Sequence, residues 1–435
     1  MPQITPGHLS QAALDTLLAE PLDWRFKGLP GTLHGLSIRD VQDRGANLFR
    51  DGFLPPVTVL DDAALTHNLT TMADFCATHG FAHAPHGKTT MAPQLYARQF
   101  AHGAWGQTAA TASHLRIYRA FGVNRIILAN ELVDDAALRW LAAELDRDPG
   151  FEFWCWVDSV RGVELMTSAL RAAGGTRPVD VLLEFGAAGG RTGVRDRETG
   201  LTVAQAVAAS PVLRLTGVAD YEGAVTGDTS AEGLAAVHAH LSEVRALTLD
   251  LADRGHFDGL DQVVVTAGGS EFFDQVAEVL GEPWPLPVLP VLRSGAYITH
   301  DEGLYERVSP IGAHPRLGGP RLRPAVRAWA QVMSKPEPGL AFVTAGKRDL
   351  PYDIDLPVPV LRRAGGEVGP LAGCAMTNIN DQHGFLALGA DEALEVGDWV
   401  AFGLSHPCTT FDKVPIIPVV GADGETVVDL IRTFF

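Results

Sequence analysis

From Phe81 to Ile298 the sequence alternates regularly between short apolar runs and amphipathic stretches. A run of residues that is apolar throughout is typical of a parallel strand covered on both faces, whereas the stretches between have helical spacing. The clearest helix is predicted from Ser230 to Arg254, with Gly255 as its C-terminal cap. The eight strand candidates are "FAHAPHGK", "WGQTAAT", "RIILAN", "FWCWVD", "DVLLEFG", "LTGVADY", "QVVVTAGG" and "VLRSGAYI".

Eight β–α repeats over roughly 220 residues are the number and size of a (β/α)8 barrel. A doubly wound open sheet is the main alternative, because periodicity alone does not show that a sheet closes. After Ile298 the strand-like runs are separated by Gly, Pro and Asp turns without helical spacers, which predicts a mostly antiparallel β domain. We therefore expect an N-terminal extension over residues 1–50, an α/β barrel over 51–306 and a β domain over 307–435. The segment "PPVTVL" is predicted to lead into the barrel as a strand followed by a helix from about Asp62.

The composition narrows the class of protein. Apolar residues make up 46% and charged residues 20% of the chain, which is typical of a globular protein with a substantial core. The net charge of −18 disfavours nucleic acid and anionic membranes as partners. The N-terminus lacks the pattern of a signal peptide, and no apolar stretch is long enough to span a bilayer. The four cysteines have no regular spacing, so we expect reduced thiols and a cytoplasmic location.

The stretch "HAPHGKTTMAP" places Lys88 between a predicted strand and a predicted helix. Most lysines are solvated loop residues, but this one follows a buried-looking strand and is flanked by His86, Gly87 and two threonines. A lysine removed from water has a lowered pKa and can attack a carbonyl group to form a Schiff base. Pyridoxal phosphate is the cofactor that exploits this chemistry most often, so we interpret Lys88 as a candidate cofactor lysine.

Three further motifs could complete a cofactor site. Gly268 and Gly269 in "TAGGS" could present backbone amides to a phosphate at a helix N-terminus, although an isolated Gly-Gly is more often a tight turn. The "RSGAY" motif, which contains Tyr297, could add amides, because barrels commonly bind phosphate after their last two strands. Arg191 in "GGRTG" and Tyr221 in "VADYEG" follow the fifth and sixth strands as candidate polar partners of a cofactor ring.

Together with "GAWGQTAATASHL" and "RIILANELVD", these motifs resemble those of pyridoxal-phosphate enzymes of fold type III, which have an alanine-racemase-like barrel. More closely, they resemble the D-serine dehydratase and D-threonine aldolase family, from about Pro55 to Lys413. Thr90 and Met91 depart from the His and Lys that family members often carry, and the first 50 residues lie outside the match. The resemblance implies Lys88 as the Schiff-base lysine, and a cofactor site comprising Lys88, His86, Arg191, Tyr221, Gly268, Gly269, Ser270 and Tyr297.

A second candidate site lies in "GLSHPCTTFDK", where His406 and Cys408 are two residues apart in a run predicted to be extended. Positions i and i+2 of a strand point to the same face, so an imidazole and a thiolate could converge there on one zinc ion. An isolated His-x-Cys pair is usually coincidence, but the resemblance implies that the catalytic metal of the family binds at this place. The dehydratase branch uses His and Cys there, whereas the aldolase branch tends to have an aspartate instead of the cysteine.

We therefore expect a lyase that uses pyridoxal phosphate and a divalent metal to convert D-3-hydroxy amino acids such as D-serine into a 2-oxo acid and ammonia. Lys88 would remove the α-proton, and zinc would assist departure of the hydroxyl group. Cleavage to glycine and an aldehyde is the nearest alternative, and 3-hydroxy-D-aspartate is a further plausible substrate. A non-catalytic pyridoxal-phosphate carrier and a barrel without cofactor remain open, whereas racemisation has no use for the metal pair. Family barrels are typically dimers, so a homodimer is expected.

Overall fold

The computed structural model describes residues 4–389 and 394–435, which form two compact units. The first, which we call the barrel unit, comprises residues 4–10, 72–88 and 96–295. The second, which we call the β unit, comprises residues 11–71, 89–95, 296–389 and 394–435. Three of the boundaries fall inside helices, namely α3 (Asp62–His79), η2 (Gly87–Thr89) and α4 (Pro93–Ala101).

The barrel unit contains the eight parallel strands that the sequence predicts, in the order β2-β9-β8-β7-β6-β5-β4-β3. A parallel bridge between His86 and Thr108 joins the two ends of this order, so the strands close into a ring and the open doubly wound sheet is excluded. The strands are β2 (Ala82–His83), β3 (Gln107–Ala109), β4 (Arg125–Glu131), β5 (Glu152–Val157), β6 (Val179–Phe185), β7 (Leu213–Asp220), β8 (Val263–Ala267) and β9 (Val288–Leu292).

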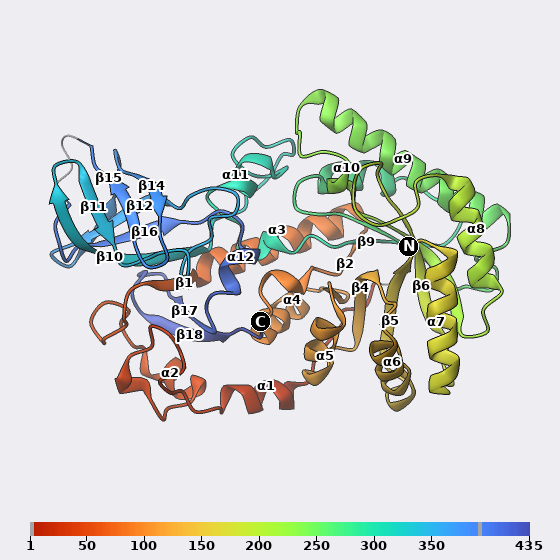
Figure 1. The fold of residues 1–435 in the computed structure, drawn as a ribbon, viewed down its shortest axis with the longest axis horizontal. Helices are drawn as coiled ribbons and strands as arrows, with labels where there is room; N and C mark the ends of the chain where they lie inside the picture. Colours follow the sequence, from red (N-terminus) through yellow and green to blue (C-terminus); the bar gives the residue numbers. More distant parts are fainter. Residues whose placement is uncertain (1–3, 390–393) are drawn as a thin grey trace. The chain divides into compact units, whose positions relative to one another are not determined.

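Amphipathic helices surround these strands (Figure 1). The longest, α9, begins after its N-cap Ser230, whose side chain accepts the N–H of Gly233, and ends next to Gly255 in the left-handed conformation, which confirms the predicted helix. Its buried face includes Val237, Leu241 and Val244. The helices of this unit include α5 (Ala112–Ala120), α6 (Asp135–Arg147), α7 (Val160–Ala173), α8 (Arg197–Ala208), α9 (Ala231–Asp253) and α10 (Phe273–Leu280).

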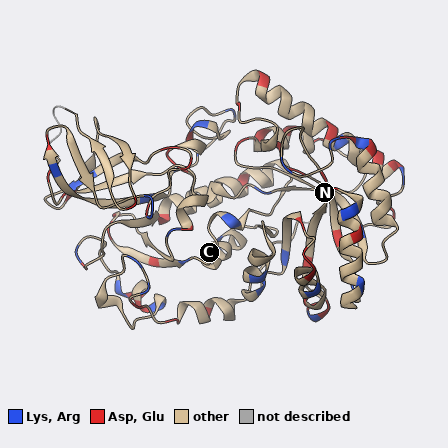
Figure 2. Ribbon diagram, viewed as in Figure 1, with Lys and Arg blue, Asp and Glu red and all other residues tan. Residues whose placement is uncertain are grey.

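The interior of the ring is filled by side chains rather than open. Trp105, Trp154 and Trp156 pack there with aliphatic residues from β4, β6, β8 and β9. Because the hydrophobic effect drives burial of both faces of each strand, the apolar runs in the sequence locate the strands correctly. On the outer helices, acidic and basic residues are interspersed (Figure 2), as where Arg197 lies 3.4 Å from Glu243 and 3.2 Å from Asp250.

The β unit is built on a sheet whose main path runs β13-β12-β16-β10-β1-β17-β18, with β11, β15 and β14 branching from β10. Every pairing is antiparallel except β1 with β17, as the turn-rich C-terminal sequence predicts. The strands are β1 (Val57–Asp61), β10 (Val326–Glu337), β11 (Leu340–Val343), β12 (Val358–Ala364), β13 (Glu367–Pro370), β14 (Ala375–Ile379), β15 (Gly384–Ala387), β16 (Trp399–Gly403), β17 (Ile416–Val420) and β18 (Val427–Arg432).

The division of the chain differs from the expected contiguous ranges in two respects. First, β1 lies between β10 and β17 of this sheet, so only the helix that follows it leads into the barrel. Second, residues 11–50 contribute α1 (Gln11–Leu18) and α2 (Ile38–Arg44) to the β unit, and Ile38 and Val41 are buried in its core with Trp329 and Leu430. Strand partners are decided by distant segments, which a local sequence pattern does not encode.

Short helices complete the β unit and the junctions. They are η1 (Gly31–Leu33), η2 (Gly87–Thr89), η3 (Glu222–Ala224), η4 (Ala296–Ile298), α11 (Leu304–Val308) and α12 (Cys408–Phe411). None of the helices within the described ranges combines the length and the apolar composition that crossing a membrane requires.

Candidate active site

Lys88 lies in η2, directly after the first barrel strand. The turn before it is tight: Tyr96 Oη donates a hydrogen bond to the carbonyl of Gly87 at 2.8 Å, and a Cβ atom at Gly87 would lie 2.5 Å from Tyr118 Oη. Only glycine fits between these two tyrosines, whose rings meet edge to face at 5.0 Å. Packing of Gly87 against the two tyrosines therefore determines where the backbone places Lys88, the next residue.

Two histidines share the electrostatic environment of Lys88. Burial, followed by the positive charge of Lys88, lowers the pKa of His86 well below its usual value. The same two causes lower the pKa of His114. Both imidazoles are therefore neutral near pH 7 and add no positive charge beside the lysine. His86 Nδ1 is buried and has no hydrogen-bond partner among the residues that the structure describes, so it can serve a bound group.

Arg191 and Tyr221, predicted from separate motifs, lie together. The guanidinium carbon of Arg191 is 4.3 Å from the centroid of the Tyr221 ring, a cation–π contact. Tyr221 follows β7 as the residue before η3. Burial, with the charges of Glu222 and Glu271, raises the pKa of Tyr221 to about 12, so its hydroxyl group remains a hydrogen-bond donor at neutral pH.

The amides that the sequence predicts to be available for a phosphate are engaged by a carboxylate. Gly268 N–H donates to Glu222 Oε2 and Gly269 N–H donates to Glu222 Oε1, each at 2.8 Å. Glu222 is fully buried, and Ser294 Oγ also donates to the carbonyl oxygen of Gly269. The two glycine N–H groups are thus not free donors here, because their hydrogen atoms already point at Glu222; Ser270, half-buried, is the next residue.

Close backbone approaches explain why glycines occupy this region. A Cβ atom at Gly269 would lie 2.9 Å from Cε2 of Tyr221, and one at Gly295 would lie 2.8 Å from Cβ of His86. These glycines leave space next to His86 and Tyr221 that a side chain would otherwise fill. Tyr297, in η4, is assigned to the β unit and is buried there.

His406 and Cys408 are not on a strand, contrary to the expected extended run. β16 ends at Gly403, His406 has a left-handed φ of 65°, and Cys408 is the first residue of α12 after Pro407. This turn nevertheless brings the two side chains into contact. A hydrogen bond with the side chain of Cys408, followed by one with Asp353, raises the pKa of His406 to about 9 against the effect of burial.

Two aspartates that the sequence analysis did not single out hold His406. Asp353 Oδ2 lies 2.6 Å from Nδ1 of the imidazole. Asp301 Oδ2 accepts the backbone N–H of His406 at 2.9 Å. A carboxylate on one ring nitrogen is the usual partner of a metal-binding histidine, because it fixes the tautomer and the ring orientation. The chemistry of the donor set, one imidazole and one thiol, therefore fits a metal such as zinc.

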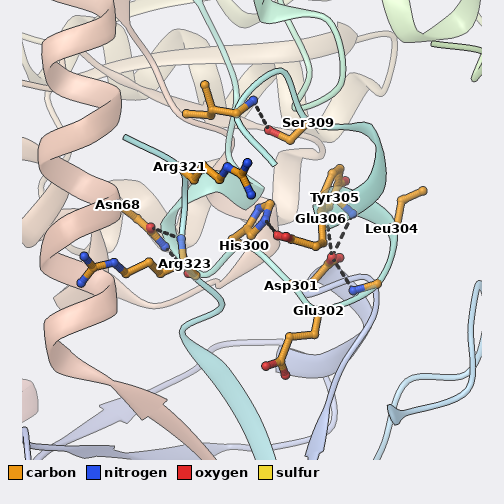
Figure 3. A network of polar contacts seen from close by, with 12 residues as sticks. Asn68, His300, Asp301, Glu302, Leu304, Tyr305, Glu306, Ser309, Arg321 and Arg323 are labelled. Carbon is orange, nitrogen blue, oxygen red and sulfur yellow. Dashed lines mark hydrogen bonds and ion pairs between the residues drawn. The ribbon is translucent and has the colours of Figure 1, made fainter. Parts of the chain in front are cut away.

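Asp301 belongs to the "THDEG" segment, and Figure 3 shows how it organises the turn that follows. Its Oδ1 accepts the N–H groups of Gly303 at 3.0 Å, Tyr305 at 2.8 Å and Glu306 at 3.3 Å, while His300 Nε2 pairs with Glu306 at 2.8 Å. Burial raises the pKa of Asp301, against these bonds and the bond from His406. The signal in the sequence that could have identified Asp301 is its place as an acidic residue directly after the eighth barrel motif.

Backbone strain concentrates in the same motifs. Within residues 4–389 and 394–435, the residues other than glycine with a positive φ are Met91 at 43°, His300 at 47° and His406 at 65°. Such conformations cost on the order of 1–3 kcal/mol and cluster at functional sites. They lie in "KTTM" and "SHPC", which were selected from the sequence, and in "THDEG", which contains Asp301. Thr89, the residue that follows Lys88, has its hydroxyl oxygen 3.3 Å from the sulfur of Cys408 within the β unit.

The closed parallel barrel with a following β domain defines the fold of the alanine-racemase-like proteins. A structure of an alanine-racemase-like protein from Idiomarina loihiensis superposes with a TM-score of 0.69 at 18% identity, covering 87% of this chain and 96% of that one. Residues 325–420 match the family model described as "Putative serine dehydratase domain". The resemblance to the D-serine dehydratase and D-threonine aldolase family is thereby confirmed.

Individual relatives extend this similarity along the chain. A D-threonine aldolase of an Arthrobacter species is 29% identical over 366 residues, 82% of this chain and 86% of that protein. A 3-hydroxy-D-aspartate aldolase of Paracoccus denitrificans (strain Pd 1222) is 27% identical over 306 residues, 69% of this chain and 74% of that protein. The crystal structure of D-threonine aldolase from Filomicrobium marinum has a TM-score of 0.74 at 26% identity, covering 88% of this chain and 95% of that one.

The fold is shared with a dehydratase as well. The D-threo-3-hydroxyaspartate dehydratase from Delftia sp. HT23 has a TM-score of 0.69 at 24% identity, covering 88% of this chain and 97% of that one. A cysteine-to-alanine mutant of a D-threo-3-hydroxyaspartate dehydratase is described as a metal-free form. The named relatives are thus lyases of two kinds, aldolases and a dehydratase.

Proposed function

We propose that this chain is a lyase of D-3-hydroxy amino acids that uses pyridoxal phosphate and a divalent metal, with D-serine as a representative substrate. The products would be a 2-oxo acid and ammonia. The observation that carries the proposal is the His406 site. Asp353 and Cys408 contact the imidazole, and Asp301 accepts the backbone N–H of His406, which has a left-handed backbone conformation. The names of the relatives, all acting on D-3-hydroxy amino acids, support the substrate class.

The residues of the barrel mouth fit the cofactor. Lys88 would hold it covalently, Arg191 and Tyr221 would contact its ring, and His86 would offer its unpartnered Nδ1. Because Glu222 occupies the N–H groups of Gly268 and Gly269, Ser270 and the "RSGAY" segment are left as phosphate donors, with the glycine pair shaping the loop. When bound, pyridoxal phosphate supplies an electron sink for the negative charge that develops at the α-carbon.

Lys88 would act as the base that removes the α-proton. The imidazoles of His86 and His114 are neutral and favour this role. Neither adds a positive charge, which would weaken Lys88 as a base. His406 and Cys408 would hold the metal, zinc by the preference of the donor set, and a metal there supplies a Lewis acid for the substrate hydroxyl group. Thr89, the residue after Lys88, contacts Cys408 within the β unit.

Retro-aldol cleavage to glycine and an aldehyde is the second candidate. It is favoured by the aldolase names of both curated relatives and of the Filomicrobium structure. Cys408 favours dehydration, because the aldolase branch tends to have an aspartate in its place. Both reactions use the same lysine and the same metal pair, and they differ in whether the hydroxyl group departs or loses its proton.

A product assay separates these possibilities. Purified protein is incubated with D-serine, D-threonine and 3-hydroxy-D-aspartate, each with zinc, with manganese and with a chelator. Dehydration gives one equivalent of ammonia and a 2-oxo acid, whereas retro-aldol cleavage gives glycine and an aldehyde. A protein that binds pyridoxal phosphate but converts none of the three under any condition would be the non-catalytic carrier. Light scattering on the same sample tests the homodimer, which stays a prediction.

A further inference from the structure

Three carboxylates that the proposed reaction does not use meet at the carboxyl ends of neighbouring barrel strands. Glu131 is the last residue of β4, Asp158 directly follows β5, and Glu184 lies near the end of β6. These strands are adjacent in the barrel order. One oxygen atom from each side chain lies within 4.8 Å of the other two, which is the spacing of ligands around a single ion.

Two of these carboxylates are poorly compensated by the protein. Glu184 is 7% exposed, and its Oε2 has no hydrogen-bond partner among the described residues. Oε1 of Glu131 is likewise buried and without a partner in that part of the chain. A buried carboxylate oxygen without a donor is costly, at about 1–3 kcal/mol or more for a charged group. Two carboxylates that face one another need either a proton or a cation between them.

The arginine whose charge acts on Glu184, Arg293, forms its hydrogen bonds with other groups. The guanidinium group of Arg293 donates to Thr266 Oγ1 at 2.7 Å and to the carbonyl oxygen of Asp220 at 2.5 Å. Its charge acts on Glu184 through space, but no arginine or lysine forms an ion pair with Glu131, Asp158 or Glu184 among the interactions found for residues 4–389 and 394–435. Gly193 N–H donates to Asp158 Oδ2 at 3.2 Å, which leaves the other oxygen of Asp158 available.

We propose that Glu131, Asp158 and Glu184 bind a divalent cation of the oxygen-preferring kind, represented by Mn²⁺, Mg²⁺ or Ca²⁺, in addition to the metal at His406 and Cys408. Three carboxylates supply hard oxygen ligands and three negative charges, which suits these ions better than it suits a metal that prefers thiolate. Binding of a cation would offset the desolvation cost that the unpartnered carboxylate oxygens carry in the empty site. The cation would therefore connect the carboxyl ends of β4, β5 and β6.

The cation also has a structural consequence for the cofactor residues. The loop from Gly186 to Arg195 carries Arg191, and its Gly193 is bonded to Asp158. Val194 N–H donates to the carbonyl oxygen of Glu184 at 2.8 Å, so the same loop is attached to a second proposed ligand. A cation on these carboxylates fixes both attachment points and with them the position of Arg191 over Tyr221. It acts on the loop rather than on the reacting atoms.

The competing explanation is a shared proton. Burial, followed by the charge of Glu184, raises the pKa of Glu131 to about 9, so that without a cation this carboxyl group retains a proton at neutral pH. Binding of a cation would expel that proton. Cation affinity is then expected to rise with pH, because the ligands must be deprotonated.

Mn²⁺ binding to the 435-residue chain tests the proposal. His406→Ala and Cys408→Ala are combined to remove the thiolate site, and Mn²⁺ binding is followed by electron paramagnetic resonance and by calorimetry. We expect one equivalent to bind in this background. Adding Glu184→Gln should weaken binding by at least about tenfold, since one charged ligand becomes neutral. The matched control Glu278→Gln changes an exposed carboxylate on α10 and should leave binding as it was.

Two results would overturn the proposal. One is that the double variant binds no Mn²⁺ and keeps the infrared carbonyl band of a protonated carboxyl group when Mn²⁺ is added. This result would assign the cluster to a shared proton. The other is that binding survives Glu184→Gln unchanged. Glu131→Gln provides a second variant if Glu184→Gln fails to fold, because glutamine resembles the protonated side chain. Circular dichroism and the melting temperature of each variant report whether it is folded.

Discussion

Asp353 Oδ2 lies 2.6 Å from Nδ1 of His406, and this contact fixes which nitrogen of the imidazole is left for a metal. The same aspartate accepts a hydrogen bond from Thr409 Oγ1 at 2.8 Å through its other oxygen, so the carboxylate is itself held in place. Residues 53 positions apart in the chain thus form the carboxylate–histidine arrangement of metal sites.

Replacing Asp353 with asparagine is expected to lower the affinity for zinc about 10- to 100-fold while leaving the metal ligands in place. The amide can still accept a hydrogen bond but no longer stabilises the imidazole by its charge. Competition with a chromogenic chelator measures the affinity. The control is Asp355→Asn, which alters an acidic residue two positions away that is bonded to Arg307 and Ser405. Equal zinc affinities for Asp353→Asn and the unmodified chain would exclude this role.

Lys88→Ala is expected to abolish covalent attachment of pyridoxal phosphate and to lower kcat by at least about 100- to 10,000-fold, because the base for the α-proton is lost. Borohydride reduction followed by peptide mapping should label the unmodified chain at residue 88 and leave the variant unlabelled. Lys347→Ala, at a half-buried lysine of the β unit, serves as the control. Labelling of a different lysine in the unmodified chain would contradict the assignment.

Glu222→Gln is expected to weaken pyridoxal-phosphate binding and to lower the melting temperature. The buried carboxylate accepts two N–H bonds, and glutamine would turn an NH2 group toward one of those donors. Leaving one buried amide without an acceptor costs about 1–3 kcal/mol. Absorbance titration with the cofactor and thermal unfolding measure the two effects. Glu232→Gln, at an exposed position in the first turn of α9, should change neither quantity.

The contact of His240 with Asp220 predicts a pH-dependent contribution to stability. The two side chains meet at 2.7 Å, and although burial lowers the pKa of His240, the hydrogen bond and charge of Asp220 outweigh it and raise the pKa above 6.5. A raised pKa in the folded state stabilises the protein fully below the unfolded value of about 6.5, and this contribution is lost as pH rises through the folded pKa. His240→Gln should therefore destabilise the chain more at pH 5.5 than at pH 9.

Chemical denaturation at several pH values measures the destabilisation, which is expected to be larger at the acidic end. Asp220→Asn should remove the same pH dependence, and the double variant should add little to either single change. A destabilisation by His240→Gln that is constant across the pH range would show that packing alone matters at this position.

Gly217→Ala is expected to destabilise the barrel by about 1–3 kcal/mol or more, because a Cβ atom there would overlap the backbone of Val264 in the neighbouring strand β8. The obstructing atoms are main-chain atoms, so no side chain can turn away. Gly227→Ala is the matched control, since a Cβ atom at Gly227 meets nothing within 4 Å. Similar melting temperatures for the two variants would show that the strands separate more easily than their packing indicates.

The sequence alone was sufficient for the eight barrel strands, the long helix α9 and the position of Lys88 after the first strand. These features follow from local patterns: apolar runs, helical spacing, and glycines where the backbone makes close approaches. Arg191 and Tyr221 were selected from separate motifs, and they lie together because the carboxyl ends of successive barrel strands share one end of the ring.

Only the tertiary structure decided the rest. The strand partners of β1, the packing of residues 11–50 against the β unit and the turn at His406 depend on segments far away in the chain. The use of Glu222 by two glycine amides and the cluster of Glu131, Asp158 and Glu184 depend on which strand ends are adjacent. A local pattern specifies whether a residue is buried, but not which distant group it meets, because that choice is made by packing of the whole unit.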